Sequence, residues 1–433
     1  MTRPRLLLLE LNEVNFEMLS AYANEGHLPH FAALLGRHGY CKTSSETRYE
    51  HLEPWIQWVT AHTGLRLEEH RVFRLGDITS TDYEQIWEKL EREHGLKSGA
   101  LSPMNARNRS KSPAFFIPDP WTDAEVVASP SLRRLFGAIR QTVNDNSSSR
   151  ITPRSALALG AGLARYAAPS SYDLYAKLIV GAGRRPWNKA LLLDLLLGDL
   201  FLAQLRETGP DFASLFVNAA AHVQHHYFFN SKFYTGGRKN PDWYVDPDLD
   251  PVLDSYRVHD RILGRIRRAH PEARLMLATG LHQVPHECVT YYWRLRDHES
   301  FLRQIDAPFS AVEPRMSRDF LVRCRDDAEA RQTAWILENA RAEDGLPLFE
   351  VDNRGDSLFV MLSYPRDVGD DFVWKLGERA FTDFRRAISF VAIKNGQHDG
   401  TGYFMDTGLA KNELPDEFPL SQLTGRITEA VAA

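Results

Sequence analysis

The chain has 433 residues, of which 43% are hydrophobic, and its formal net charge is -5. This length allows two or three domains of average size, and the charge excludes the strongly basic surface of a typical nucleic-acid-binding protein. No apolar run approaches the roughly 20 residues that span a bilayer. The three cysteines, at positions 41, 288 and 324, are an odd and scattered set, which is typical of a reducing compartment. We therefore expect a cytoplasmic protein with no membrane span and no nucleic-acid partner, while its oligomeric state stays open.

The N-terminal segment has the pattern of a strand followed by a helix. Leu6 to Leu11 is an almost continuous aliphatic run, which is typical of a strand covered on both faces. The polar residues Asn12 and Glu13 follow it, and a helix is predicted from Phe16 to Glu25. This order is that of the first βα unit in a doubly wound sheet.

The middle of the chain changes character. From about residue 130 to residue 205 the pattern is mostly helical, which predicts a helical cap insertion over 126–205. Residues 1–125 and 206–433 then form an α/β core, with a small α+β insertion at 300–385. The predicted class is α/β, with a doubly wound and mostly parallel sheet.

Three histidines share one position in this predicted layout, because each lies just past an apolar strand. They are His225 after Leu215 to Val217, His282 in the loop after Arg274 to Ala278, and His398 in the glycine-rich loop after Phe390 to Ile393. Loops at the carboxyl ends of parallel strands meet at one edge of the sheet, so the three imidazoles are expected to converge. Imidazoles bind zinc, manganese or iron. The alternative for each histidine is a half-buried structural role.

Four more residues are candidates for this edge. Asn12 ends the first strand and faces the edge, unless it only caps the following helix. His222 shares the stretch of His225. Thr47 offers a hydroxyl nucleophile in the polar loop from Gly39 to Glu53, although loop threonines are commonly turn formers. Glu53 flanks the same loop and is a candidate acid, base or ligand.

The order of these segments resembles the alkaline phosphatase superfamily, particularly its type I phosphodiesterase/nucleotide pyrophosphatase branch. The similar motifs are Gly26-His-Leu-Pro-His-Phe31, Pro54 to Gly64, Glu69-His70, Ala221-His-Val-Gln-His225, Gly280-Leu-His282, and Gln397-His398 with Gly400 and Gly402. Together they cover about half of the chain. The resemblance implies an alkaline phosphatase-like fold, bound divalent metal, and a small-molecule substrate that contains phosphate.

The same resemblance shows what this chain lacks. The aspartates of the branch fall on Asn12, Ala221 and Leu281, and its nucleophile falls on Pro54, so Thr47 replaces it only if the loop is longer here. A two-metal site needs anionic ligands to offset about four positive charges. The resemblance therefore implies either a single ion, zinc or manganese, or none. The residues around a single ion would be Asn12, His222, His225, His282 and His398, with Glu10, Glu13, Glu50 or Glu53 as the anionic ligand.

Two hypotheses for the function follow. The first is a metal-assisted hydrolase or transferase acting on a phosphate ester or phosphodiester of a small molecule, with Thr47 or a water as the nucleophile. The second is a protein that keeps the fold but has lost two-metal hydrolysis. Such a protein binds a phosphorylated sugar or nucleotide, or performs metal-free acid–base chemistry through Glu53 and the histidines.

Overall fold

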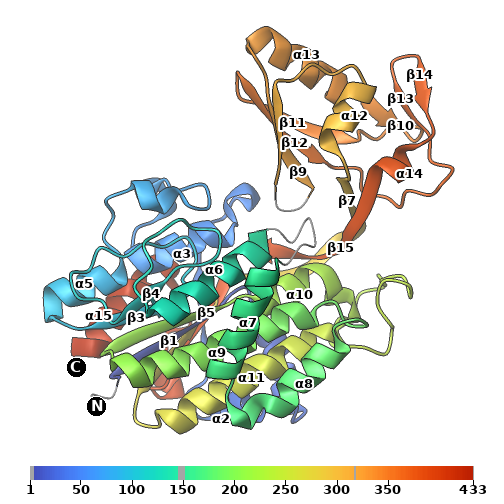
Figure 1. Ribbon diagram of the computed structural model, residues 1–433. Coiled ribbons are helices and arrows are strands. Elements are labelled where there is room, and N and C mark those ends of the chain that lie inside the picture. The colour runs from blue at the N-terminus through green and yellow to red at the C-terminus, as the bar shows by residue number, and fades with distance from the viewer. Residues whose placement is uncertain (1–3, 145–151, 316–317, 433) are drawn as a thin grey trace.

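The computed structural model describes residues 4–144, 152–315 and 318–432 and is built around an eight-stranded sheet (Figure 1). The strand order is β17-β2-β16-β6-β1-β5-β3-β4. Every hydrogen-bonded pair in this sheet is parallel except the two pairs made by β16, which confirms the predicted class. The strands are β1 (Leu6–Leu11), β2 (Cys41–Ser44), β3 (Ser98–Leu101), β4 (Phe115–Ile117), β5 (Phe212–Val217), β6 (Arg274–Ala278), β16 (Thr401–Asp406) and β17 (Glu417–Pro419).

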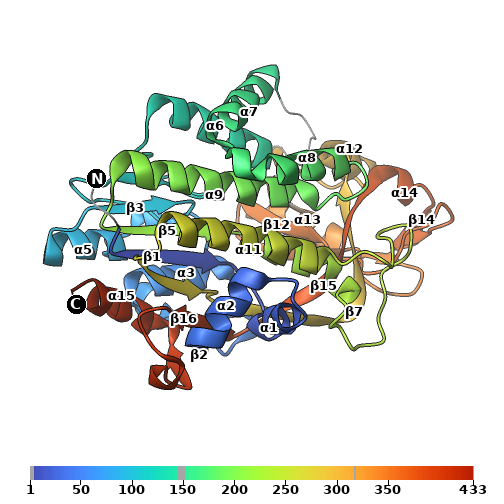
Figure 2. The ribbon, with the colours of Figure 1, turned by 90° about the horizontal axis from the view of Figure 1, so that it is seen from below.

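Helices cover both faces of the sheet, as Figure 2 shows from below. One face carries α1 (Phe16–Asn24), α2 (Pro29–His38), α6 (Pro130–Asn144), α7 (Pro153–Tyr166), α8 (Tyr172–Gly181), α9 (Asn188–Thr208), α10 (Ala219–Tyr227) and α11 (Pro251–Ala269). The other face carries α3 (Pro54–Thr63), α5 (Ile86–His94) and α15 (Leu423–Ala432), and α4 (Leu67–His70) packs beside α3.

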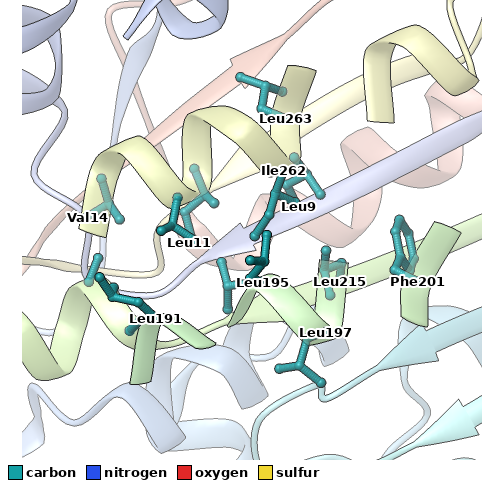
Figure 3. Close-up of a cluster of buried hydrophobic side chains, with 14 of the residues drawn as sticks. Leu9, Leu11, Val14, Leu191, Leu195, Leu197, Phe201, Leu215, Ile262 and Leu263 are labelled. Atoms are coloured by element: carbon teal, nitrogen blue, oxygen red, sulfur yellow. The ribbon is translucent and has the colours of Figure 1, made fainter. Parts of the chain in front are cut away.

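The strand β1 shows why this three-layer arrangement forms. Successive side chains of a strand point to opposite faces, and every residue of β1 is buried. Leu7, Leu9 and Leu11 belong to the same buried cluster as the side chains of α9 and α11 (Figure 3). Leu6 and Leu8 belong to the cluster of α3, α5 and α15. The aliphatic run is thus the strand that both helical layers cover.

The four helices α6 to α9 share one hydrophobic core with the sheet. The longest of them, α9, lies on the sheet beside α11 and buries two acidic side chains, Asp194 and Asp199. None of the helices in the described ranges is both long and apolar enough to cross a membrane.

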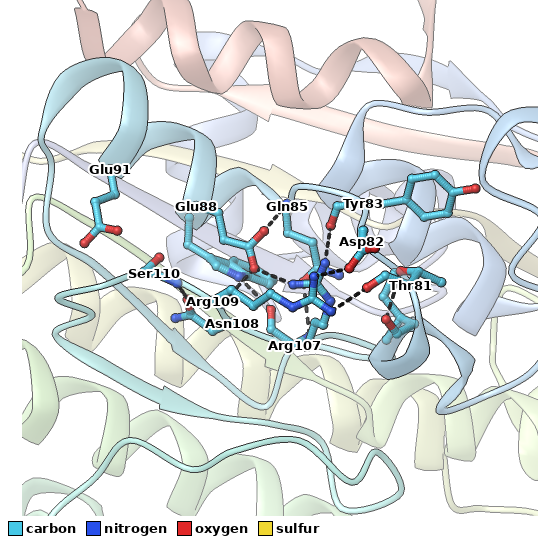
Figure 4. Close-up of polar contacts among 12 residues, drawn as sticks. Thr81, Asp82, Tyr83, Gln85, Glu88, Glu91, Arg107, Asn108, Arg109 and Ser110 are labelled. Atoms are coloured by element: carbon cyan, nitrogen blue, oxygen red, sulfur yellow. Dashed lines mark hydrogen bonds and ion pairs between the residues drawn. The ribbon is translucent and has the colours of Figure 1, made fainter.

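A polar network fixes the loop between β3 and β4 against α5 (Figure 4). The Arg107 side chain forms an almost fully buried ion pair with Glu88, with Nη1 and Oε1 2.8 Å apart. The backbone N–H of Arg109 donates to the same carboxylate, and the Trp87 indole donates to the Arg107 carbonyl. The Glu88 carboxylate therefore binds the loop at two residues, Arg107 and Arg109.

A second, smaller unit stands apart from the sheet and has its own hydrophobic core (Figure 1). Its elements are α12 (His298–Gln304), β8 (Ala311–Pro314), β9 (Asp319–Arg323), α13 (Asp327–Glu338), β10 (Ala340–Ala342), β11 (Phe349–Asn353), β12 (Ser357–Leu362), β13 (Trp374–Leu376), β14 (Arg379–Phe381) and α14 (Phe384–Ala387). Two long antiparallel strands, β7 (His282–Leu295) and β15 (Ile388–Asp399), join it to the α/β core as a ribbon.

The ribbon corrects the prediction for the C-terminal part of the chain. Phe390 to Ile393 is not a core strand, because it lies in β15, which pairs with β7 alone. Aromatic residues cover Phe390 instead: its ring centre lies 5.6 Å from that of Trp293 and 5.5 Å from that of Tyr244. The predicted loops at 279–286 and 395–402 are also largely strand. After the ribbon, the chain returns to the large sheet as β16, which is antiparallel to both of its neighbours.

Candidate functional site

The candidate site lies at the edge of the sheet where the parallel strands β1, β5 and β6 end. Glu13 follows β1, His225 lies on α10 after β5, and His398 lies near the end of β15. The backbone of Glu13 has a φ of 58°, which is uncommon for a residue other than glycine. Its N–H donates to the Thr279 carbonyl after β6, and its carbonyl accepts from the Gln224 side chain. These bonds hold a strained residue at the junction of three strands, as is common at functional sites.

Three possible ligand atoms meet at this edge. Glu13 Oε2 lies 3.1 Å from His225 Nε2 and 3.2 Å from His398 Nε2, and the two nitrogens are 3.2 Å apart. Two ligands of one zinc ion, each bonded at about 2.0–2.2 Å in a tetrahedral arrangement, lie about 3.3–3.6 Å apart, slightly more than these separations. The spacing and the donor set of two imidazoles and one carboxylate therefore fit a single transition-metal ion with open coordination positions.

Without an ion, the three groups interact as a carboxylate paired with imidazoles. Burial alone would raise the pKa of Glu13, but His398 and His225 outweigh it and hold that pKa well below its usual range. Burial would lower the pKa of His398, and the Glu13 carboxylate reverses this and raises it. If both imidazoles were protonated on Nε2, two N–H groups would crowd one carboxylate oxygen. A metal ion would relieve this crowding by accepting all three lone pairs.

A layer of amides holds the Glu13 carboxylate in place. The Asn12 side chain donates to Glu13 Oε1 at 3.0 Å and to Asn218 Oδ1, while its own oxygen accepts from the Trp58 indole. The Gln283 side chain donates to Glu13 Oε2 and to the Ala221 carbonyl. Hydrogen bonds of this kind orient the ligands of metal sites. Asn12 therefore contacts the carboxylate rather than joining the three converging atoms.

The helix that carries His225 is fixed from behind by α9. The buried Asp194 carboxylate accepts from the backbone N–H groups of Asn218 and Ala219 at the start of α10, at 3.2 and 2.8 Å. His259 of α11 contacts the same carboxylate at 2.8 Å. A carboxylate at a helix N-terminus is favourable, so this contact sets the position of α10 against the sheet.

Glu53 is the next acidic group beyond the three ligands. It precedes α3 at the N-cap position, and its Oε2 lies 3.9 Å from His398 Nδ1. Partial burial raises the pKa of Glu53 to about 7, although His398 acts in the opposite direction. A carboxyl group with such a pKa is suited to accept or donate a proton near neutral pH.

Three other predicted residues lie outside this group. His282 is the first residue of β7, and its Nδ1 donates to the Thr401 carbonyl at 2.6 Å. His222 is exposed, and its ring lies against that of His226, with centres 4.9 Å apart. Thr47 is exposed in the segment after β2. The structure thus brings together His225, His398 and Glu53 of the predicted residues.

The pairing of the ribbon explains why His398 and His282 separate. His398 lies directly opposite Gln283, and Asp399 lies opposite His282. Successive residues of a strand point to opposite faces, so Gln283 and His398 share the face toward Glu13. His282 and Asp399 share the other face.

Sequence reasoning did not single out two members of the site. Glu13 was one of four candidate anionic ligands. Its place two residues after the end of β1 is the sequence feature that could have distinguished it from the other three. Gln283 had no signal in the sequence, because its orientation depends on the ribbon being a strand at that point.

The sequence and the structure of the chain were compared with those of known proteins. No model of a known protein family matches the sequence, and no curated protein matches it either. Phosphonoacetate hydrolase from Sinorhizobium meliloti 1021, in complex with phosphonoacetate, is 13% identical with a TM-score of 0.46 over 99% of this chain and 96% of that chain. Murine ectonucleotide pyrophosphatase/phosphodiesterase 5, in complex with AMP, is 10% identical with a TM-score of 0.41 over 99% and 95%. The human protein of that name is 11% identical with a TM-score of 0.43 over the same shares.

The likeness to these solved structures is distant, with identities of 10–13% and TM-scores of 0.41–0.46. At this identity it does not extend to the residues of the site.

Proposed function

We propose that this chain is a hydrolase or transferase of phosphate esters that holds one divalent metal ion, zinc or manganese, through Glu13, His225 and His398. The observation that carries the proposal is the convergence of their three ligand atoms, all within 4.8 Å of one another, from three separate elements. An ion bound there supplies Lewis acidity to a phosphoryl oxygen and offsets its negative charge.

The side chains of the site divide the remaining work. Glu13 supplies the negative charge, and Asn12 and Gln283 orient its carboxylate by hydrogen bonds. Glu53, beside His398, takes a proton from the water or hydroxyl group that attacks phosphorus. Thr47 stays a predicted nucleophile. Its side chain is exposed, and no contact with Glu13, His225 or His398 supports that role.

A second candidate function is metal-free acid–base chemistry on a bound phosphorylated ligand. One observation favours it: Glu13 Oε2 already has hydrogen-bonding contacts to both imidazoles and to Gln283, so the group is satisfied by its own members. In that case the same three residues would form a proton relay rather than a set of ligands.

Elemental analysis together with an activity assay decides between the two. The purified protein is treated with chelator, supplied with zinc or manganese, and tested with an aryl phosphate and an aryl phosphodiester. We expect about one tightly bound equivalent of metal and turnover that needs it. The Glu13→Gln variant should lose both. Turnover by the chelated protein would support the metal-free alternative, and neither metal nor turnover would contradict both.

A further inference from the structure

Two basic side chains lie beside the candidate site without an acidic partner in contact. Lys394 lies on β15, four residues before His398, and Arg318 immediately precedes β9 of the smaller unit. Among the described residues, neither cation has a carboxylate oxygen within 4.0 Å. Unpaired cations that are partly buried are costly unless something anionic binds them.

Aromatic side chains position both cations. Lys394 Nζ donates to the hydroxyl of Tyr49 at 3.4 Å and lies 6.0 Å from the centre of its ring. The Arg318 guanidinium lies 4.0 Å from the centre of the Tyr292 ring, in cation–π contact. Tyr292 is paired with Ala392 in the ribbon, two residues from Lys394, so the two cations lie along the same stretch.

The two cations and Glu53 also interact electrostatically. Burial lowers the pKa of Lys394, Arg318 lowers it further, and Glu53 acts against both. The carboxylates within electrostatic range are Glu53, near Lys394, and Asp319, near Arg318.

The spacing relates this pair to the proposed reaction centre. Lys394 and His398 are four residues apart on β15, and four residues of an extended strand span roughly 13 Å. Glu53 interacts with both residues: its Oε2 lies 3.9 Å from His398 Nδ1, and its carboxylate interacts electrostatically with Lys394. The distance suits a small molecule with its phosphoryl group at Glu13, His225 and His398 and a further group several bonds away.

We propose that Lys394 and Arg318 form a subsite for a second anionic group on the substrate, a carboxylate or another phosphate. The inference rests on the proposed function for the place of the reacting phosphoryl group. It narrows the substrate to phosphate esters whose organic part is itself negatively charged. Lysine and arginine are the usual partners of such groups.

Binding measurements test the subsite without needing turnover. The probes are 4-carboxyphenyl phosphate, 1,4-phenylene bisphosphate and the neutral analogue 4-carbamoylphenyl phosphate, titrated calorimetrically into the protein with and without zinc. We expect the wild type to bind at least one charged probe about five- to tenfold more tightly than the neutral one. The charged probe that is preferred identifies carboxylate or phosphate as the second group.

Matched variants locate the preference. Lys394→Gln and Arg318→Gln should each reduce it severalfold and together abolish it, while Lys375→Gln, an exposed lysine on β13, should keep it. Thermal melts check that each variant is folded. Equal binding of the three probes by the wild type, binding of none, or a preference that survives in the double variant would overturn the subsite. A preserved preference without metal-dependent hydrolysis would instead contradict only the proposed function.

Discussion

Two glutamates of the first strand region meet imidazoles in opposite ways. Glu10 lies within β1 and contacts His62 of α3 at 3.2 Å, and both side chains are at most 1% exposed. Glu13 lies just beyond the end of β1 and meets His225 and His398, whose side chains are 29% and 13% exposed. The first pair is enclosed between sheet and helix, whereas the second group reaches the surface.

The difference separates a structural pair from a candidate site. Glu10 Oε1 and His62 Nδ1 have no hydrogen-bond partner among the described residues, and no further histidine or acid completes the pair. A substrate cannot reach it. At Glu13, a second imidazole, partial exposure and a nearby acid occur together. Residue types alone therefore do not define the site, since convergence and access are needed as well.

The largest expected effect is on metal affinity. Replacing one of the three ligands, as in Glu13→Gln, His225→Ala or His398→Ala, should weaken zinc binding by roughly a thousandfold, because each ligand supplies a sizeable share of the binding free energy. His282→Ala should leave the affinity within about twofold, because His282 faces the other side of the ribbon. Competition titration with a chromophoric chelator measures both. Equal losses in His225→Ala and His282→Ala would show that the ligands are not those proposed.

The enclosed pair should affect stability instead. His62→Leu leaves the Glu10 carboxylate buried without its partner, so we expect the free energy of unfolding to fall by about 3 kcal/mol. The double variant Glu10→Met/His62→Leu should recover much of this, because it removes both polar groups. Urea denaturation measures the changes. Zinc affinity should be unaffected in the folded variants, and a large loss of affinity would mean that the two groups are coupled.

Another buried imidazole, His70 of α4, allows a structural histidine to be recognised by the pH dependence of stability. Its Nδ1 accepts from the Val72 N–H, its Nε2 lies 3.1 Å from Thr60 Oγ1, and burial lowers its pKa to about 4 from 6.5. The unfolded chain therefore takes up this proton first. The stability due to neutral His70 is complete above pH 6.5 and is lost as the pH falls from 6.5 through 4, about 3 kcal/mol in all.

Denaturation of the wild type and His70→Gln between pH 4 and pH 8 measures this contribution. The difference between the two proteins should shrink as the pH falls. A difference that stays constant with pH would show that His70 is not kept neutral by the fold.

The smallest effect is expected from the amide layer. Gln283→Leu removes a donor to Glu13 without removing a ligand, so zinc affinity should fall about 10- to 100-fold. The same titration measures it, and a thermal melt shows whether the variant folds. Affinity equal to that of the wild type would mean that the carboxylate is held by Asn12 alone.

The sequence allowed the α/β core to be predicted because its strands carry their own signal. Leu6 to Leu11 is aliphatic except for Glu10, and Leu275 to Ala278 is apolar throughout, which is typical of strands covered on both faces. The ribbon could not be predicted in this way. Phe390 to Ile393 is also apolar, but its Phe390 ring packs against aromatic residues distant in sequence, and a local pattern does not identify such partners.

The site, too, could be predicted in part, and the rest depends on contacts between distant segments. The convergence of His225 and His398 was expected, and the structure brings them together, but His398 reaches the site on the ribbon rather than after a strand of the large sheet. Their partner could not be chosen among four glutamates, because the choice of Glu13 depends on its backbone conformation after β1. The orientation of His282 depends on the strand register opposite Asp399, which no local pattern specifies.

The most direct test of the central claim is anomalous X-ray diffraction from crystals of this protein grown with zinc. We expect one strong peak within about 2.0–2.2 Å of Glu13 Oε2, His225 Nε2 and His398 Nε2. A peak beside His282 instead, or the absence of any peak at Glu13 in zinc-saturated crystals, would contradict it.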